Sequence, residues 1–165
     1  MSGFFFSGSH EAKLDDKNRL VLPQNFRYGL VENGQLQISL SLGLGGCLTL
    51  YKRSDMEKIV EKFQKKQHLA KYQPFFTVFF STLYHTECDK IGRITLPPLL
   101  KRAVKIEDEV VIAGVLNKIE IWPKQAFEEQ LRALLEGRDS GINLMKMAEE
   151  AFLLLGDEEE VPHET

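Results

Sequence analysis

The sequence predicts an α+β fold in which one β-rich unit occurs twice within 165 residues. The first observation is a signature at residues 14–23 that returns at 88–97: an aspartate, an arginine four positions later, and a proline four positions after the arginine. The second is the alternation of aliphatic and polar residues at 48–51, which returns at 119–122 and again ends in a large aromatic side chain. Patterns that recur together in this way indicate two copies of one supersecondary unit.

Each signature is expected to form a strand, a tight turn and a second strand. Leu14 and residues 20–22 supply strand-forming side chains in the first copy. Asn18 and Gly92 occupy equivalent positions in the turns, where a positive φ is the natural explanation because glycine and asparagine tolerate it best. The prolines of both signatures then end the strands.

Further short elements are expected in both copies. Amphipathic helical turns follow the signatures, and strands follow these turns. The expected helical turns lie at 24–28 and 98–104, and the expected strands at 36–40, 48–51, 109–113 and 119–122.

Longer helices are predicted after each copy and between them. Ser54 to Glu57 have the form of a capping box, and apolar residues follow at helical spacing. Pro123 opens a second long helix that ends near Gly137. Phenylalanines at helical spacing predict a helix at 74–84, with a strand as the alternative, and residues 142–155 form a further amphipathic segment.

Charge is distributed unevenly along the chain. The formal net charge is −3, but residues 1–105 carry a net charge of +7 and residues 106–165 carry −10. This asymmetry is compatible with a basic surface that binds a polyanion, and equally with an ordinary solvated surface.

Membrane insertion and secretion are not supported by the composition. No apolar run approaches the roughly 20 residues needed to cross a bilayer, and residues 4–6 lack the flanking features of a signal peptide. Two cysteines, Cys47 and Cys88, are too few for a disulfide framework or a four-cysteine zinc site. These features predict a cytoplasmic protein without membrane contact.

Catalysis and metal binding also find little support. His85 and Cys88 lie three residues apart, but Cys88 aligns with the apolar Leu14 across the repeat, which fits a buried structural cysteine. No glycine-rich phosphate loop, nucleophile elbow or zinc-protease motif is present. We therefore expect no enzymatic activity, no small-molecule substrate, no cofactor and no metal.

The paired Asp-x-x-x-Arg signatures, the aromatic-ended strands and the helices after them resemble the MraZ family. Its members are bacterial regulators of the division and cell-wall gene cluster, built from two AbrB-like repeats. The resemblance covers nearly all of residues 4–155 and departs at Asn18, where the family usually has glycine.

The resemblance implies a pseudo-symmetric double swapped-hairpin, AbrB-like β barrel with flanking helices. The first repeat would occupy residues 4–53, connecting helices 54–81, the second repeat 82–125 and C-terminal helices 126–155. Residues 156–165, rich in Asp and Glu, are expected to form a disordered acidic tail.

The resemblance further implies a closed homo-oligomeric ring, associated with the nucleoid, that binds double-stranded DNA. Its targets would be short direct repeats in the protein's own promoter region, bound through Arg19 and Arg93. Asp15 and Asp89 occupy the family's aspartate positions. A guanidinium held on a rigid turn can pair bidentately with a guanine edge or a phosphate, which agrees with this role.

The remaining candidate residues surround these arginines. Nearby lysines would attract phosphates regardless of sequence: Lys13, Lys17 and Lys90. Four residues are assigned to the structure of the turns: Asp15, Asn18, Asp89 and Gly92.

Two alternatives stay open. Each aspartate and arginine could simply form a salt bridge that fixes the turn, although a bridged arginine can still contact DNA. The protein could also be an interaction module, such as an AbrB-like antitoxin or an assembly adaptor, whose acidic tail and amphipathic C-terminal segment bind a partner protein.

Overall fold

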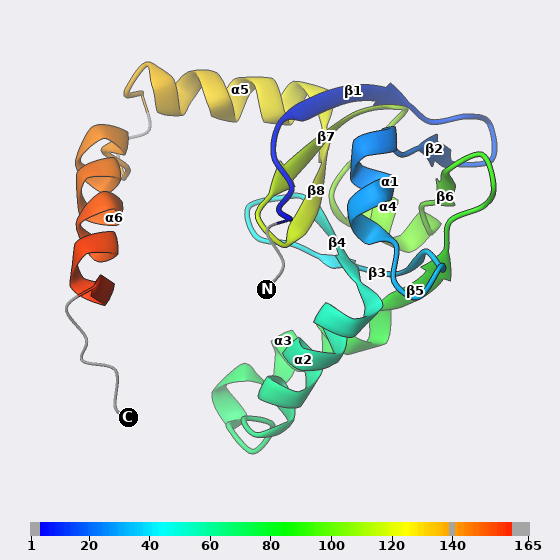
Figure 1. Cartoon of the computed structure of the whole chain (residues 1–165), viewed down its shortest axis with the longest axis horizontal. Helices are drawn as coiled ribbons and strands as arrows, with labels where there is room; N and C mark the ends of the chain where they lie inside the picture. Colours follow the sequence, from blue (N-terminus) through cyan, green and yellow to red (C-terminus); the bar gives the residue numbers. More distant parts are fainter. Residues whose placement is uncertain (1–3, 139–140, 160–165) are drawn as a thin grey trace. The chain divides into compact units, whose positions relative to one another are not determined.

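The computed structural model describes residues 4–138 and 141–159 of the chain. Two compact units are distinguished, one reaching to Lys124 and one starting at Gln125 (Figure 1). The first unit holds all the strands that the structure describes, together with short helices, and the second is helical. This mixture confirms the predicted α+β class.

The strands form two antiparallel sheets. Their bounds are β1 (Ser9–Lys13), β2 (Arg19–Val21), β3 (Gln37–Leu42), β4 (Leu48–Lys52), β5 (Tyr84–Glu87), β6 (Arg93–Thr95), β7 (Glu109–Val115) and β8 (Lys118–Pro123). A six-stranded sheet has the order β1-β7-β8-β4-β3-β5, and β2 pairs with β6 in a separate two-stranded ribbon. The strands expected after the signatures are confirmed, with ends that differ by at most two residues.

Strands of the first half pair with strands of the second half. β1 pairs with β7, β2 with β6, β3 with β5, and β4 with β8. The two strands expected on either side of each turn therefore do not pair with each other. In the first signature, the strands on either side of the turn, β1 and β2, lie in different sheets, and Leu14 lies outside both.

The pairing register is equivalent in the two halves. In the ribbon, Arg19 lies opposite Thr95 and Val21 lies opposite Arg93. A shift of 74 residues, the separation of the two signatures, exchanges these two pairs. The six-stranded sheet ends at β1 and β5 without closing on itself within the described residues, so the swapped-hairpin barrel is not confirmed.

Helices α1 (Gln24–Leu30) and α4 (Pro98–Ala103) follow the ribbon strands and complete the core. Phe26 of α1 and Leu100 of α4 are each 1% exposed. Leu20 and Ile94, the central pair of the ribbon, are buried in the same core. Full burial of each such side chain stabilises the fold by about 1.5–3 kcal/mol. The inward face of the ribbon is thereby fixed to the body of the unit.

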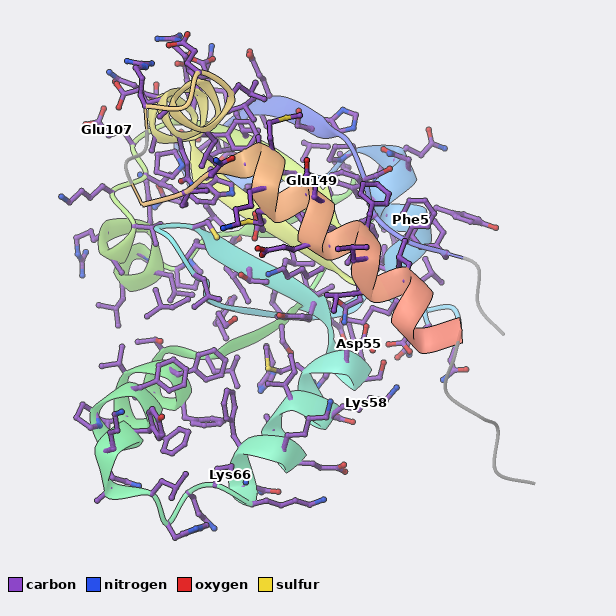
Figure 2. The ribbon with its side chains drawn as sticks, turned by 90° about the vertical axis from the view of Figure 1, so that its left-hand side faces the viewer. Phe5, Asp55, Lys58, Lys66, Glu107 and Glu149 are labelled. Atoms are coloured by element: carbon purple, nitrogen blue, oxygen red, sulfur yellow. The ribbon has the colours of Figure 1, made fainter. Side chains whose placement is uncertain are left out.

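Helices α2 (Arg53–Gln64) and α3 (Gln73–Thr82) form an arm between the two halves of the chain, joined through the 3₁₀ helix η1 (Ala70–Tyr72) (Figure 1). Lys58 extends from α2 away from α3 (Figure 2). The ring of Phe63 packs 5.6–6.0 Å, centroid to centroid, from four rings of α3: Phe75, Phe76, Phe79 and Phe80. The helix predicted at 74–84 is confirmed and the strand alternative is wrong.

The capping box predicted for α2 is not formed. The N-cap of α2 is Lys52, and it makes no side-chain capping hydrogen bond. The hydroxyl of Ser54 instead donates to the carboxylate of Glu32, with both oxygens 2.7 Å away. A tertiary partner has replaced the local one, because a charged acceptor makes the stronger hydrogen bond.

The second unit contains α6 (Leu144–Glu159) and nearly all of α5 (Lys124–Leu135). Gly137, with a φ of 70°, follows α5 as predicted. The disordered tail predicted at 156–165 is wrong for residues 156–159, which continue α6; residues 160–165 lie outside the described residues. Glutamate is a good helix former, so a helix already begun by apolar residues can extend through it. No helix in the described part of the chain combines the length and apolar character needed to cross a bilayer.

Candidate nucleic-acid interface

The Asp15 carboxylate organises the first signature turn. Its Oδ1 accepts hydrogen bonds from the backbone N–H groups of Lys17 and Arg19, each at 2.9 Å. Its Oδ2 accepts from Nε of Arg19 at 2.8 Å. Asn18 completes the turn with a φ of 59° and donates its backbone N–H to the Asp15 carbonyl at 3.1 Å.

The second signature turn repeats this arrangement. Oδ1 of Asp89 accepts from the backbone N–H groups of Ile91 at 3.0 Å and Arg93 at 2.8 Å. Its Oδ2 accepts from Nε of Arg93 at 2.6 Å. Gly92 has a φ of 95°, so the positive φ predicted at both equivalent positions is confirmed.

Both carboxylates remain ionised at neutral pH. The pKa of Asp15 is lowered, first by the backbone N–H of Arg19 and then by its guanidinium, against a partial desolvation that acts in the opposite direction. The pKa of Asp89 is lowered by the same groups of Arg93. Each arginine is therefore held by a charged acceptor and not by a neutral one, which makes the hydrogen bond stronger.

The ion pairs occupy only one edge of each guanidinium. Nε of Arg19 and of Arg93 bonds to its aspartate, while neither Nη1 nor Nη2 bonds to any other described residue. The two arginine side chains are 28% and 31% exposed. The salt bridge and an outward binding role are thus compatible, because the bridge orients the guanidinium and leaves two donor nitrogens unused.

The ribbon places both arginines on one face. Successive residues of a strand point to opposite faces, and Leu20 and Ile94 point inward. Arg19 and Arg93 therefore point outward, beside the exposed Val21. The result is a short two-stranded ribbon that carries two equivalent arginines on its open face.

The three predicted lysines are placed differently. Lys17 and Lys90 are exposed in the two turns, next to the arginines. Lys13 lies at the end of β1, where its Nζ is 4.0 Å from Oδ2 of the exposed Asp108. Such a surface pair contributes little to stability, but it partly compensates the positive charge of Lys13.

The residues that suggested catalysis do not form a catalytic pair. Nδ1 of His85 is 2.7 Å from the hydroxyl of Ser39, and burial lowers the pKa of His85. Cys88 packs against the core, and burial raises the pKa of its thiol, which keeps it protonated. Among the described residues, no group of three or more His, Cys, Asp and Glu side chains could hold a metal ion.

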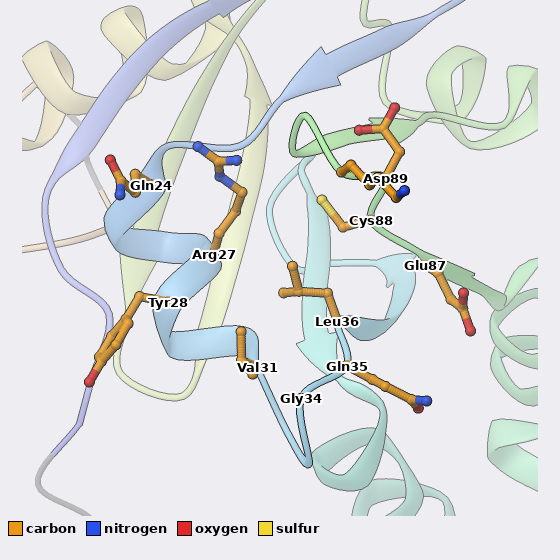
Figure 3. A pocket seen from close by; sticks show the side chains of 11 residues that line it. Gln24, Arg27, Tyr28, Val31, Gly34, Gln35, Leu36, Glu87, Cys88 and Asp89 are labelled. Carbon is orange, nitrogen blue, oxygen red and sulfur yellow. The ribbon is translucent and has the colours of Figure 1, made fainter.

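An open pocket of about 540 Å³ lies beside the second turn (Figure 3). Arg27 of α1 lines one side of it, and Cys88 and Asp89 line the opposite side, while Lys90 also belongs to the lining. Glu87 contributes a further negative charge. Charges of both signs share this lining, so the pocket has no clear preference for an anion or a cation.

Two cations that the sequence analysis did not single out approach the turns. Arg27 donates to the carbonyl of Ile91, and Lys101 donates to the side chain of Asn18. Arg27 and Lys101 are 74 residues apart, the same separation as the two signatures. Extending the repeat past the prolines would have aligned these two cations with each other, although not with the groups that they contact.

Fold and site together define a class: a two-repeat α+β protein that presents a pair of carboxylate-held arginines on one β-ribbon. The family model described as "MraZ protein, putative antitoxin-like" matches residues 5–75 and 79–153. The chain belongs to the MraZ family. The two matched segments confirm the predicted repeat.

Curated relatives have the same family name. The chain is 36% identical over 124 residues to "Transcriptional regulator MraZ" of Pelotomaculum thermopropionicum, an alignment that covers 74% of this chain and 83% of the relative. It is 34% identical over 135 residues to "Transcriptional regulator MraZ" of Pediococcus pentosaceus, covering 81% and 92%. The family is thus one of transcriptional regulators and not of enzymes.

Proposed function

We propose that this protein regulates transcription by binding double-stranded DNA through the ribbon formed by β2 and β6. Arg19 and Arg93 read base edges in this proposal. The observation that carries it is the pair of equivalent guanidinium groups, each bonded through Nε to its aspartate and each with Nη nitrogens that make no hydrogen bond to another described residue. A two-stranded β-ribbon fits the width of the DNA major groove.

The chemistry of the arginines favours guanine. A guanidinium with two free nitrogens can donate to O6 and N7 of one guanine, and a good bidentate contact of this kind discriminates against a wrong base by about 1–3 kcal/mol. Because Asp15 and Asp89 fix the guanidinium groups in advance, less side-chain entropy is lost on binding.

The lysines supply the part of the affinity that does not depend on sequence. In this proposal Lys17 and Lys90, which are exposed beside the arginines, approach phosphates, and Lys13 is a weaker candidate because Asp108 lies next to it. Each phosphate contact releases counterions and steepens the salt dependence of binding.

The finer features of the proposal concern assembly and target. We propose that the protein forms a closed homo-oligomeric ring in the cytoplasm, bound to the nucleoid, and contacts short direct repeats in its own promoter region upstream of the division and cell-wall gene cluster. The cross-half strand pairing supports a swapped-hairpin relationship between repeats at 4–53 and 82–125, flanked by connecting helices at 54–81 and C-terminal helices at 126–155. A single ribbon is a small contact, and linked contacts can raise overall avidity by about 10²–10⁴.

Paired binding and stability measurements test the proposal. Arg19→Ala and Arg93→Ala should each weaken binding to the DNA upstream of the gene strongly, and weaken binding to a scrambled duplex to a smaller extent because a positive charge is lost. Lysine at these positions should restore general affinity without sequence preference, because it lacks the fork geometry. The matched control is Arg132→Ala, which removes the same charge from the exposed face of α5. Unchanged affinity with a lowered melting temperature would assign the arginines to the turn alone.

A protein-interaction module is the second candidate function. It is favoured by large apolar side chains that α6 exposes: Met145, Met147, Phe152, Leu153, Leu154 and Leu155. Retention on a phosphate-mimicking resin, with elution by salt, distinguishes the two functions. The double variant Arg19→Ala, Arg93→Ala should elute early if the ribbon binds DNA, and should elute with the unmodified protein if it does not.

A further inference from the structure

Each signature turn is held by a cation that comes from the helix of the other half. Arg27 of α1 donates from Nη1 to the carbonyl oxygen of Ile91 at 2.9 Å. Lys101 of α4 donates from Nζ to Oδ1 of Asn18 at 2.9 Å. Arg27 and Lys101 are related by the same separation as the two turns, so the two donors are equivalent. Their acceptors differ, because Arg27 bonds to the backbone of Ile91 and Lys101 to the side chain of Asn18.

The approach of Arg27 depends on the glycine of the second turn. A Cβ added at Gly92 would lie 2.6 Å from Cδ and 2.7 Å from Cζ of Arg27. The guanidinium therefore packs directly on the backbone of the turn that presents Arg93. Its Nε is buried and makes no hydrogen bond to another described residue, so packing and the bond to Ile91 set its orientation.

We propose that Arg27 and Lys101 are positioning residues for DNA recognition, each fixing the turn that presents the arginine of the opposite half. This inference rests on the proposed function of Arg19 and Arg93. A recognition side chain must be held within about 0.5 Å of its productive geometry, and the residues that support it provide this precision. Phosphate contacts tolerate displacement better, because the attraction between two charges depends less on direction than a bidentate hydrogen bond does.

The crossed arrangement gives the proposal a distinctive consequence. Arg27 lies close in sequence to the first signature but supports the second, and Lys101 lies close to the second but supports the first. Loss of Arg27 should therefore loosen residues 89–93 and leave residues 15–19 unchanged. General destabilisation would not follow this pattern.

Amide hydrogen exchange in the full chain, without DNA, tests the crossed support. Arg27→Met should accelerate exchange of the Gly92 and Arg93 amides by roughly five- to tenfold, the factor that one net hydrogen bond provides, and leave the first turn unchanged. Lys101→Met should have the reverse effect, and it tests the proposal on its own if Arg27→Met fails to fold. Equal acceleration in both turns, or none, overturns the proposal.

Conservative and matched variants refine this test. Arg27→Lys keeps a donor and should restore slow exchange, since lysine serves at the equivalent position. Arg102 is the exposed neighbour of Lys101 and makes no hydrogen bond to the first turn. Arg102→Met therefore removes the same charge and should leave exchange in the first turn unchanged. If Arg102→Met accelerates exchange as much as Lys101→Met, loss of charge explains the effect and positioning is wrong.

DNA binding completes the experiment. Arg27→Met should lower the ratio of specific to scrambled affinity by roughly tenfold, the lower part of the range for a bidentate base contact, and leave the salt dependence unchanged. A salt slope reduced by about one would make Arg27 a phosphate contact and overturn the proposal. Arg93→Ala separates the two failures. If Arg93→Ala lowers the ratio of specific to scrambled affinity and Arg27→Met does not, the positioning role of Arg27 is wrong but the proposed function stands. If neither variant lowers this ratio, the proposed function is wrong as well.

Discussion

Replacing Gly92 by alanine should destabilise the protein by about 2–3 kcal/mol, because two costs add. The φ of 95° is outside the conformations that a residue with a side chain adopts easily, and such a backbone costs roughly 1–2 kcal/mol. The new Cβ would also displace Arg27, whose Cδ and Cζ lie 2.6 and 2.7 Å from its position. Displacement sacrifices the hydrogen bond to Ile91, worth about 1 kcal/mol net.

Gly34 provides the matched control for the backbone cost. Its φ is 75°, and a Cβ added there meets nothing within 4 Å. Gly34→Ala should therefore cost only the backbone contribution, roughly 1–2 kcal/mol. In an Arg27→Met background the hydrogen bond to Ile91 is already absent, so Gly92→Ala cannot remove it again and the two substitutions should be coupled by about 1 kcal/mol.

Denaturant unfolding of the four variants, followed by circular dichroism, provides the free energies. Gly92→Ala should lower the free energy of unfolding by more than Gly34→Ala does. It should lower it by less when Arg27 is already replaced by methionine than when Arg27 is present. If Gly92→Ala costs no more than Gly34→Ala, or if its effect simply adds to that of Arg27→Met, Arg27 does not pack on the turn as described.

Three further predictions concern protonation, thiol reactivity and assembly. Folding lowers the pKa of Asp89 below its ordinary value of 3.8, so the ionised Asp89 should stabilise the protein fully above pH 3.8 and lose this effect as the pH falls through the folded pKa. A carboxyl-carbon NMR titration of the folded protein should find the midpoint for Asp89 below 3.8. A midpoint at or above 3.8 would contradict the hydrogen bonds to this carboxylate. Burial raises the pKa of Cys47 to about 11, so at pH 8 its alkylation should be much slower in the native protein than in denaturant, and equal rates would contradict its burial. Affinity should rise steeply from a duplex with one repeat to a duplex with two, and should fall for a third duplex in which roughly 5 bp, half a helical turn, separate the two repeats. Equal binding to these three duplexes would argue against a ring.

Local sequence patterns were sufficient for most elements of this fold. The repeated signatures located both turns, and the residue types at Asn18 and Gly92 predicted the positive φ that both adopt. The phenylalanines between the halves predicted α3, because helical spacing places them on one face towards Phe63. These features depend on neighbours within a few residues, which a single sequence displays directly.

Features that depend on distant partners were not accessible in this way. A signature whose strands pair locally and one whose strands pair across the halves have the same alternation, so the residue pattern alone did not predict the pairing of β2 with β6. Only the family resemblance implied a swapped hairpin. The capping box predicted at Ser54 is wrong because Glu32, which lies in the loop between α1 and β3, provides a charged acceptor for the Ser54 hydroxyl. Arg27 and Lys101 were missed because their partners lie 64 and 83 residues away.

The most direct test of the central hypothesis replaces guanines of the bound DNA by 7-deazaguanine, which lacks the N7 acceptor. Binding is measured for the unmodified protein and for the Arg19→Ala, Arg93→Ala double variant, with both duplexes. If the two arginines read guanine edges, the base substitution should weaken binding of the unmodified protein by about tenfold, a factor within the range expected for a bidentate contact. It should not weaken binding of the double variant any further. An equal loss in both proteins would contradict base reading by Arg19 and Arg93.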